Sequence, residues 1–138
     1  MSIIKVLIAD DEPDVLAAMK KKVVNAGYAV ITAKDGEEAW EKIKSELPDV
    51  ILLDLTMPKL DGLEVLKNLR QNPPSVKWQP VIIVSARKEL EDMKKGFSLD
   101  ADHYLTKPCD MDAILKGIRT MVSLIPLRKS KLEMENKG

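Results

Sequence analysis

Short runs of apolar, β-branched residues alternate along this chain with longer stretches in which apolar residues recur every three or four positions. The runs predict buried strands, and the longer stretches predict amphipathic helices. We expect five strands, at residues 3–9, 28–33, 50–53, 81–84 and 101–106. We expect five helices, at residues 11–27, 35–46, 60–70, 87–99 and 110–125. Strands that alternate with helices are typical of a parallel sheet built from β-α-β units.

The order of these elements predicts an α/β fold with a doubly wound, five-stranded parallel sheet and five helices. Its commonest five-stranded form is flavodoxin-like, with strand order 2-1-3-4-5. The runs at 3–9, 50–53 and 81–84 are almost continuously apolar, which suits central strands that helices cover on both faces. The fifth run carries Asp102 and His103, so an edge position suits it better.

A chain of 138 residues can bury one core, so we expect a single domain at residues 1–125 and a polar C-terminal tail or linker at residues 126–138. Pro126 cannot donate a backbone hydrogen bond and is expected to interrupt the last helix.

Charge and composition narrow the range of partners and locations. The chain has 22 basic and 22 acidic residues, which argues against direct nucleic-acid or membrane binding. It contains no apolar run of roughly 20 residues and no export signal at its start, so we expect a cytoplasmic location. Its single cysteine, Cys109, rules out an internal disulfide.

Polar residues follow four of the predicted strands. Asp10 and Asp11 end the first strand, Asp54 the third, Ser85 the fourth and Lys107 the fifth. In an open parallel sheet the carboxyl ends of the strands form the binding edge, so these side chains should converge. Close carboxylates repel one another unless a cation neutralises them. With only hard oxygen ligands available, Mg²⁺ is the expected cofactor, and Mn²⁺ would also fit.

The residue types also predict a chemistry. A carboxylate can act as a nucleophile and form an aspartyl phosphate, and Asp54 is the best candidate because it ends a central strand alone. Lys107 would supply positive charge and Ser85 a hydroxyl donor for the phosphoryl oxygens.

These motifs resemble those of response-regulator receiver domains of two-component signalling, over about residues 3–125. The likeness is carried by the segments VLIADDE at 6–12, LLDLTMP at 52–58, VIIVSA at 81–86 and DHYLTKP at 102–108. It implies that Asp54 is the phosphoacceptor. It also implies a metal site formed by the side chains of Asp10, Asp11 and Asp54 and the backbone carbonyl of Thr56.

Two further roles follow from this resemblance. Ser85 and Tyr104 would form the switch that changes the surface made by the fourth helix, the fifth strand and the fifth helix. Thr56 and Arg87 would flank the phosphoryl group. The family also has glycine where this chain has Asp100, a residue that tolerates a left-handed backbone better than most.

The resemblance predicts a single-domain signalling switch rather than an enzyme with an external substrate. Such a protein catalyses only its own phosphorylation and dephosphorylation. The phosphodonor would be a sensor histidine kinase, a phosphotransfer protein or a small phosphodonor. The output would be an unidentified partner or a domain outside this chain, and a homodimer through the fourth and fifth helices is a further alternative.

Three competing interpretations remain open from the sequence. A phosphatase of the haloacid-dehalogenase type needs a second Asp two residues after the nucleophile, where this chain has Thr56. An adaptor that never accepts phosphate would keep the fold without the chemistry. Tyr104 could also be an ordinary half-buried strand residue with its hydroxyl in water.

Overall fold

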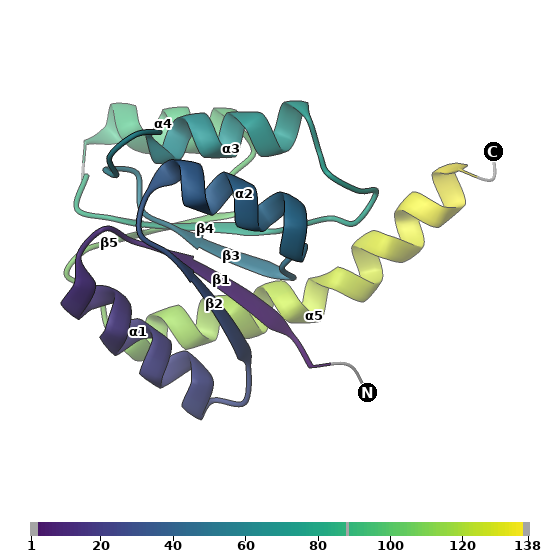
Figure 1. The fold of residues 1–138 in the computed structure, drawn as a ribbon. Coiled ribbons are helices and arrows are strands. Elements are labelled where there is room, and N and C mark those ends of the chain that lie inside the picture. Colours follow the sequence, from purple (N-terminus) through teal and green to yellow (C-terminus); the bar gives the residue numbers. More distant parts are fainter. Residues whose placement is uncertain (1–2, 88, 137–138) are drawn as a thin grey trace.

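Helices cover both faces of a five-stranded parallel sheet in the computed structural model of this chain (Figure 1). The structure describes residues 3–87 and 89–136, with side chains described up to residue 128. The strand order is β2-β1-β3-β4-β5, which confirms the predicted topology. The strands are β1 (Lys5–Ala9), β2 (Ala29–Ala33), β3 (Val50–Leu53), β4 (Val81–Ser85) and β5 (His103–Thr106).

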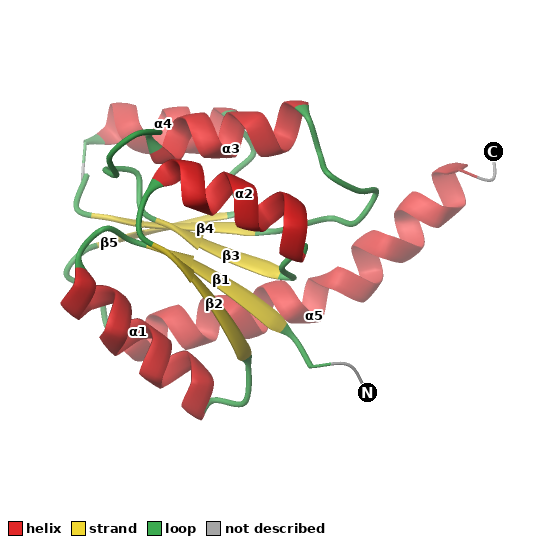
Figure 2. Cartoon of the chain, viewed as in Figure 1, coloured by secondary structure: helices red, strands yellow, loops and turns green. Residues whose placement is uncertain are grey.

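The five helices alternate with the strands as predicted (Figure 2). They are α1 (Pro13–Asn25), α2 (Gly36–Glu46), α3 (Gly62–Gln71), α4 (Leu90–Ser98) and α5 (Met111–Asn136). Most predicted ends differ from the observed ones by one to three residues, which is the usual uncertainty at helix and strand ends.

The sheet separates two apolar layers. One face carries α1 and α5, and the other carries α2, α3 and α4 (Figure 1). Every residue of β3 and β4 is buried, as are the last four residues of β1, because helices cover both sides of these strands. β5 is only partly buried and lies at an edge, as predicted; β2 forms the other edge.

Local sequence determines where several helices begin and end. Asp35 caps α2 by accepting a hydrogen bond from the Glu38 N–H, and Asp61 caps α3 by accepting one from the Leu63 N–H. The turn after α1 contains Gly27 at φ 100°. Asp100 adopts φ 64° in the turn before β5, which confirms that this turn needs a left-handed residue.

The prediction that Pro126 interrupts the last helix is wrong. α5 runs from Met111 to Asn136 with Pro126 inside it. Pro126 is exposed, and its missing N–H leaves the Val122 carbonyl without its usual helical donor. In Figure 1 the C-terminal part of α5 projects away from the sheet. The division into a domain at 1–125 and a tail at 126–138 stays a prediction.

At the edge of the sheet remote from the strands' carboxyl ends, Trp78 packs against the core and lies beneath Arg128 of α5, 5.4 Å from ring centroid to guanidinium. Nearby, Arg70 donates hydrogen bonds to Asp102 at 2.9 Å and to the Gln79 carbonyl at 2.9 Å. These contacts join α3, α5 and the start of β4.

None of the helices described here combines the length and the apolar character needed to cross a membrane.

Candidate functional site

The predicted site residues meet at the carboxyl edge of the sheet. The Asp54 N–H donates to the Ala9 carbonyl at 3.0 Å, and the Asp10 N–H donates to the Ala33 carbonyl at 3.0 Å. These bonds continue the ladders of the parallel sheet beyond its strands and fix the backbone of both acidic residues. Ser85 is the last residue of β4, and Lys107 directly follows β5.

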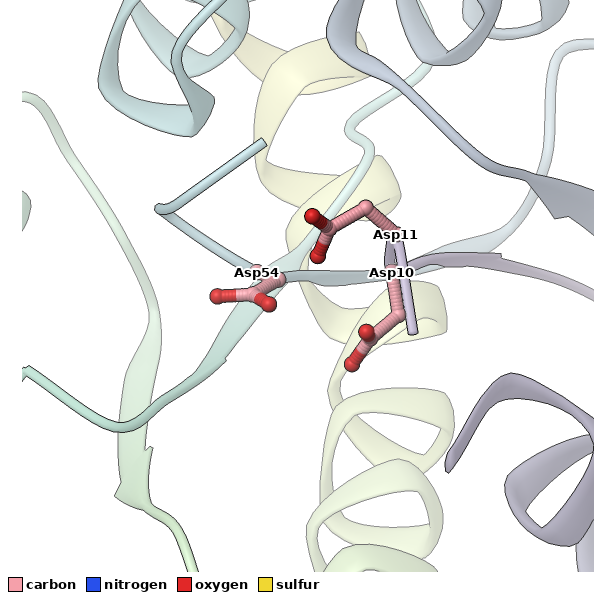
Figure 3. Close-up of side chains that lie close together, drawn as sticks. All are labelled: Asp10, Asp11 and Asp54. Carbon is pink, nitrogen blue, oxygen red and sulfur yellow. The ribbon is translucent and has the colours of Figure 1, made fainter. Parts of the chain in front are cut away.

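Asp10, Asp11 and Asp54 form an acidic cluster (Figure 3). One carboxylate oxygen from each residue lies within 4.8 Å of the other two. Asp10 and Asp54 are only 1% and 5% exposed, whereas Asp11 is exposed. The sequence therefore correctly predicted that these three side chains converge.

Lys107 is the positive group of the site. Its ammonium nitrogen lies 2.6 Å from Asp10 Oδ2 and 3.2 Å from Asp54 Oδ2. The backbone N–H of Lys107 donates to the Ser85 carbonyl at 2.8 Å, which fixes the backbone from which the Lys107 side chain extends. Burial opposes the charge on Lys107, but the two carboxylates outweigh it, so the pKa of Lys107 is raised.

Asp54 is held in a partly desolvated environment. Burial raises the pKa of its carboxyl group, and Lys107 and a hydrogen bond from the Thr56 N–H counteract only part of this effect. A methyl group on Gly62 would lie 2.2 Å from the Asp54 carbonyl oxygen, so only glycine lets α3 begin this close to the strand end. Gly62 therefore allows the start of α3 to pack directly against the backbone of Asp54.

Ser85 and Tyr104 are connected through the backbone of Arg87. Ser85 is fully buried, and its hydroxyl accepts a hydrogen bond from the Arg87 N–H at 3.2 Å. The Tyr104 hydroxyl donates to the Arg87 carbonyl at 2.7 Å. The Tyr104 hydroxyl thus has a protein partner, unlike in the interpretation that places it in water. Movement of Tyr104 as a switch stays a prediction.

The Arg87 side chain makes contacts that the sequence did not indicate. Its Nε donates to Thr56 Oγ1 at 3.0 Å and its Nη2 to Asp61 Oδ2 at 2.7 Å. Its Nη1 lies 3.9 Å from Asp92 Oδ1 in α4. Spacing along the chain gives no signal for these pairs, because they join three separate loops and helix ends. The predicted neighbours Thr56 and Arg87 are nevertheless in direct contact.

The donor set of the acidic cluster fits a divalent cation. Three carboxylates are opposed by one ammonium group that contacts only two of them, so negative charge remains in excess. Oxygen is the only donor in the cluster, which suits Mg²⁺ or Mn²⁺ and disfavours zinc or copper. Asp10, Asp11 and Asp54 could hold the ion, and the Thr56 carbonyl stays a predicted ligand.

Comparison with known proteins identifies the family of this chain. Residues 6–119 match the family model for the response regulator receiver domain. The chain is 37% identical over 132 residues to the alkaline phosphatase synthesis transcriptional regulatory protein PhoP of Bacillus subtilis (strain 168), an alignment that covers 96% of this chain and 54% of that protein. The chain spans about half the length of the curated relatives it matches.

Solved structures of similar fold include a CheY-like receiver domain protein from Methanospirillum hungatei JF-1, with a TM-score of 0.82, 26% identity and coverage of 99% of this chain and 100% of the other. The CheX-CheY-BeF3-Mg+2 complex from Borrelia burgdorferi matches with a TM-score of 0.79, 31% identity and coverage of 86% of this chain and 89% of the other. The sheet order, the matched residues and these relatives agree, so this chain belongs to the family of response regulator receiver domains.

Proposed function

We propose that this receiver domain accepts a phosphoryl group on Asp54, with a divalent cation bound by the acidic cluster and with Lys107 as the fixed positive charge. The observation that carries the proposal is the position of the Asp54 carboxylate. It is buried at the end of a central strand, 3.2 Å from the Lys107 ammonium and within 4.8 Å of two further carboxylates.

In the proposed reaction a carboxylate oxygen of Asp54 attacks phosphorus and an acyl phosphate forms. The bond from phosphorus to the donor atom, a histidine nitrogen or the oxygen of a small phosphodonor, breaks at the same time. The pair of electrons from that bond leaves with the donor. A bound Mg²⁺ would supply positive charge that neutralises phosphoryl oxygens.

Other residues of this chain would bind or flank the phosphoryl group. Lys107 sits against both buried carboxylates, where its charge can be shared with phosphoryl oxygens. The Ser85 hydroxyl, which accepts from the Arg87 N–H, would turn to donate to a phosphoryl oxygen. Thr56 and Arg87 lie together beside Asp54 and would flank the group.

The proposed partners follow from this chemistry and from the family. A histidine kinase or phosphotransfer protein would supply the phosphoryl group, and the surface of α4, β5 and α5 would change on phosphorylation. That surface would bind an output partner, a linked domain or a second copy of the chain. A role in the cytoplasm without direct nucleic-acid contact is part of the same proposal.

Mass spectrometry of the intact protein tests the proposal. Incubation with acetyl phosphate and MgCl₂ should add one phosphate mass, and Asp54→Asn or EDTA should prevent the addition. Asp14→Asn, which removes an exposed carboxylate of α1 outside the acidic cluster, is the matched control and should leave labelling intact. Labelling that persists in Asp54→Asn would place the acceptor elsewhere, and no labelling of the wild type would favour the adaptor.

A further inference from the structure

Three parts of Arg87 contact the site or its surroundings: the backbone N–H, the backbone carbonyl and the guanidinium. Its N–H donates to the Ser85 hydroxyl, and its carbonyl accepts from the Tyr104 hydroxyl. Its guanidinium joins Thr56 and Asp61 of the loop between β3 and α3 to Asp92 of α4. A change in the Ser85 hydroxyl must therefore act on the backbone that carries this guanidinium.

The guanidinium is the only one of these parts that reaches α4. It lies 2.7 Å from Asp61 and 3.9 Å from Asp92, and the three side chains are only 29%, 40% and 22% exposed. The hydrogen bond that the Arg87 guanidinium donates to Asp61 raises the pKa of Arg87 against the effect of burial, and the charges of Asp61 and Asp92 add to the increase. A planar guanidinium can contact several acceptors at once, which a lysine ammonium does with less geometric definition.

α4 has few other attachments at its start. Its N-cap residue, Glu89, makes no side-chain capping hydrogen bond. Among its described residues only Gly96, two turns further on, is buried. Helix termini without side-chain caps fray readily, so one ion pair in the first turn has a large share in holding it.

We propose that Arg87, Asp61 and Asp92 form an ionic latch that holds the first turn of α4 to the loop between β3 and α3, and that phosphorylation of Asp54 opens it. This inference rests on the proposed function. When the Ser85 hydroxyl turns toward the phosphoryl group, the Arg87 N–H loses its acceptor and the backbone at residue 87 shifts. Phosphoryl oxygens compete with the two carboxylates for the guanidinium, and Asp92 is released.

Asp92 is the residue to change, because it is the α4 member of the latch and takes no part in the proposed binding of phosphate or metal. Glu91 offers a matched control. It is an acidic residue of the same helical turn, is exposed, and does not contact Arg87 in the part of the chain that the structure describes. Asp92→Asn and Glu91→Gln each remove one negative charge from the α4 N-terminus, so the favourable interaction with the helix dipole is lost in both.

Amide hydrogen exchange of residues 89–96 measures the latch in the full chain without ligand. The Asp92 and Met93 amides donate to the Glu89 carbonyl and report opening of the first turn. We expect Asp92→Asn to exchange about 2- to 5-fold faster than Glu91→Gln at these amides, as for a partly exposed ion pair. Equal rates in the two variants would overturn the latch.

Exchange with beryllofluoride and MgCl₂, a stand-in for the aspartyl phosphate, tests its opening. In the wild type and Glu91→Gln, exchange at the start of α4 should rise, whereas Asp92→Asn should change little because its turn is already released. All three proteins should still respond at the Asp54 amide. No response at that amide in the wild type would contradict the proposed function. A response at Asp54 without one in α4 would leave that function standing and overturn the latch alone.

Discussion

Replacing Asp11 by asparagine should stabilise this protein when no metal is bound and weaken its stabilisation by magnesium. Of the three carboxylates in the acidic cluster, Asp10 and Asp54 both contact Lys107, whereas Asp11 contacts no cation among the described residues. Asp11 thus adds repulsion with the least compensation, and its main use would be to bind a cation.

The size of the effect follows from the spacing of the oxygens. Two unit charges 4.8 Å apart repel by about 0.9 kcal/mol at the dielectric constant of water and about 3.5 kcal/mol at an effective value of 20. Asp11 is exposed, so the lower figure applies to each neighbour, and Lys107 offsets part of the sum. We expect a gain of about 1 kcal/mol in the free energy of unfolding, or a few degrees in Tm.

Urea unfolding in EDTA and in MgCl₂ checks both halves of the prediction. Magnesium at ten times its Kd should stabilise the wild type by about 1.4 kcal/mol, and Asp11→Asn should show a clearly smaller increment at the same concentration. Asp14→Asn removes an exposed acid from the first turn of α1 and controls for net charge: it should lower the metal-free stability slightly, by about 0.3–1 kcal/mol through the helix dipole, and leave the magnesium increment unchanged. If Asp11→Asn destabilised the metal-free protein, or if Asp14→Asn behaved in the same way, the reasoning from clustered charge would be refuted.

Three further predictions concern the site and the packing of the fold. Gly62→Ala should cost about 1–3 kcal/mol in urea unfolding because the new methyl group meets backbone atoms. Gly117→Ala in α5 meets only side-chain atoms, of Ile82 at 3.3 Å and His103 at 3.5 Å, and should cost clearly less. Burial raises the pKa of Asp54 above its ordinary value of 3.8. The contribution of this carboxyl group to the free energy of unfolding is therefore fully present below pH 3.8, where the group is protonated, and is lost as the pH rises through the folded-state pKa. In EDTA, Asp54→Asn should therefore be more stable than the wild type at pH 7, with the difference vanishing near pH 3; a difference independent of pH would count against this assignment. Arg70→Met should leave the Asp102 carboxylate without its partner and cost about 3 kcal/mol, and Asp102→Asn in the same protein should recover part of that loss in a double-mutant cycle.

The sequence predicted the sheet and the acidic cluster because both depend on short-range patterns. The apolar runs locate the strands, and in a parallel sheet the residues that follow each run must share one edge. Asp10, Asp54 and Lys107 therefore meet although Asp10 and Lys107 lie 97 residues apart. Residue type then limits the chemistry at that edge.

The contacts of Arg87 could not be predicted in the same way. Asp61 directly precedes α3 and Asp92 lies in the first turn of α4. The starting points of both helices depend on loop conformation, and loops carry no periodic pattern. The course of α5 was also missed. Proline usually ends a helix, but the apolar residues of α5 that bury against the sheet, Ile114, Ile118 and Met121, precede Pro126, so the helix is already anchored before the proline is reached.

The chain has two tryptophans, Trp40 and Trp78, and the position of Trp78 determines what the fluorescence of that residue can report. Trp78 lies before β4, at the end of the sheet opposite Asp54, and β4 alone separates the two ends by about 16 Å. Its indole ring lies beneath the guanidinium of Arg128, so its emission should respond to the environment of α5. Trp78 lies too far from the reacting groups to contact them. Quenching of its fluorescence on addition of phosphodonor would therefore signal a rearrangement transmitted along the sheet.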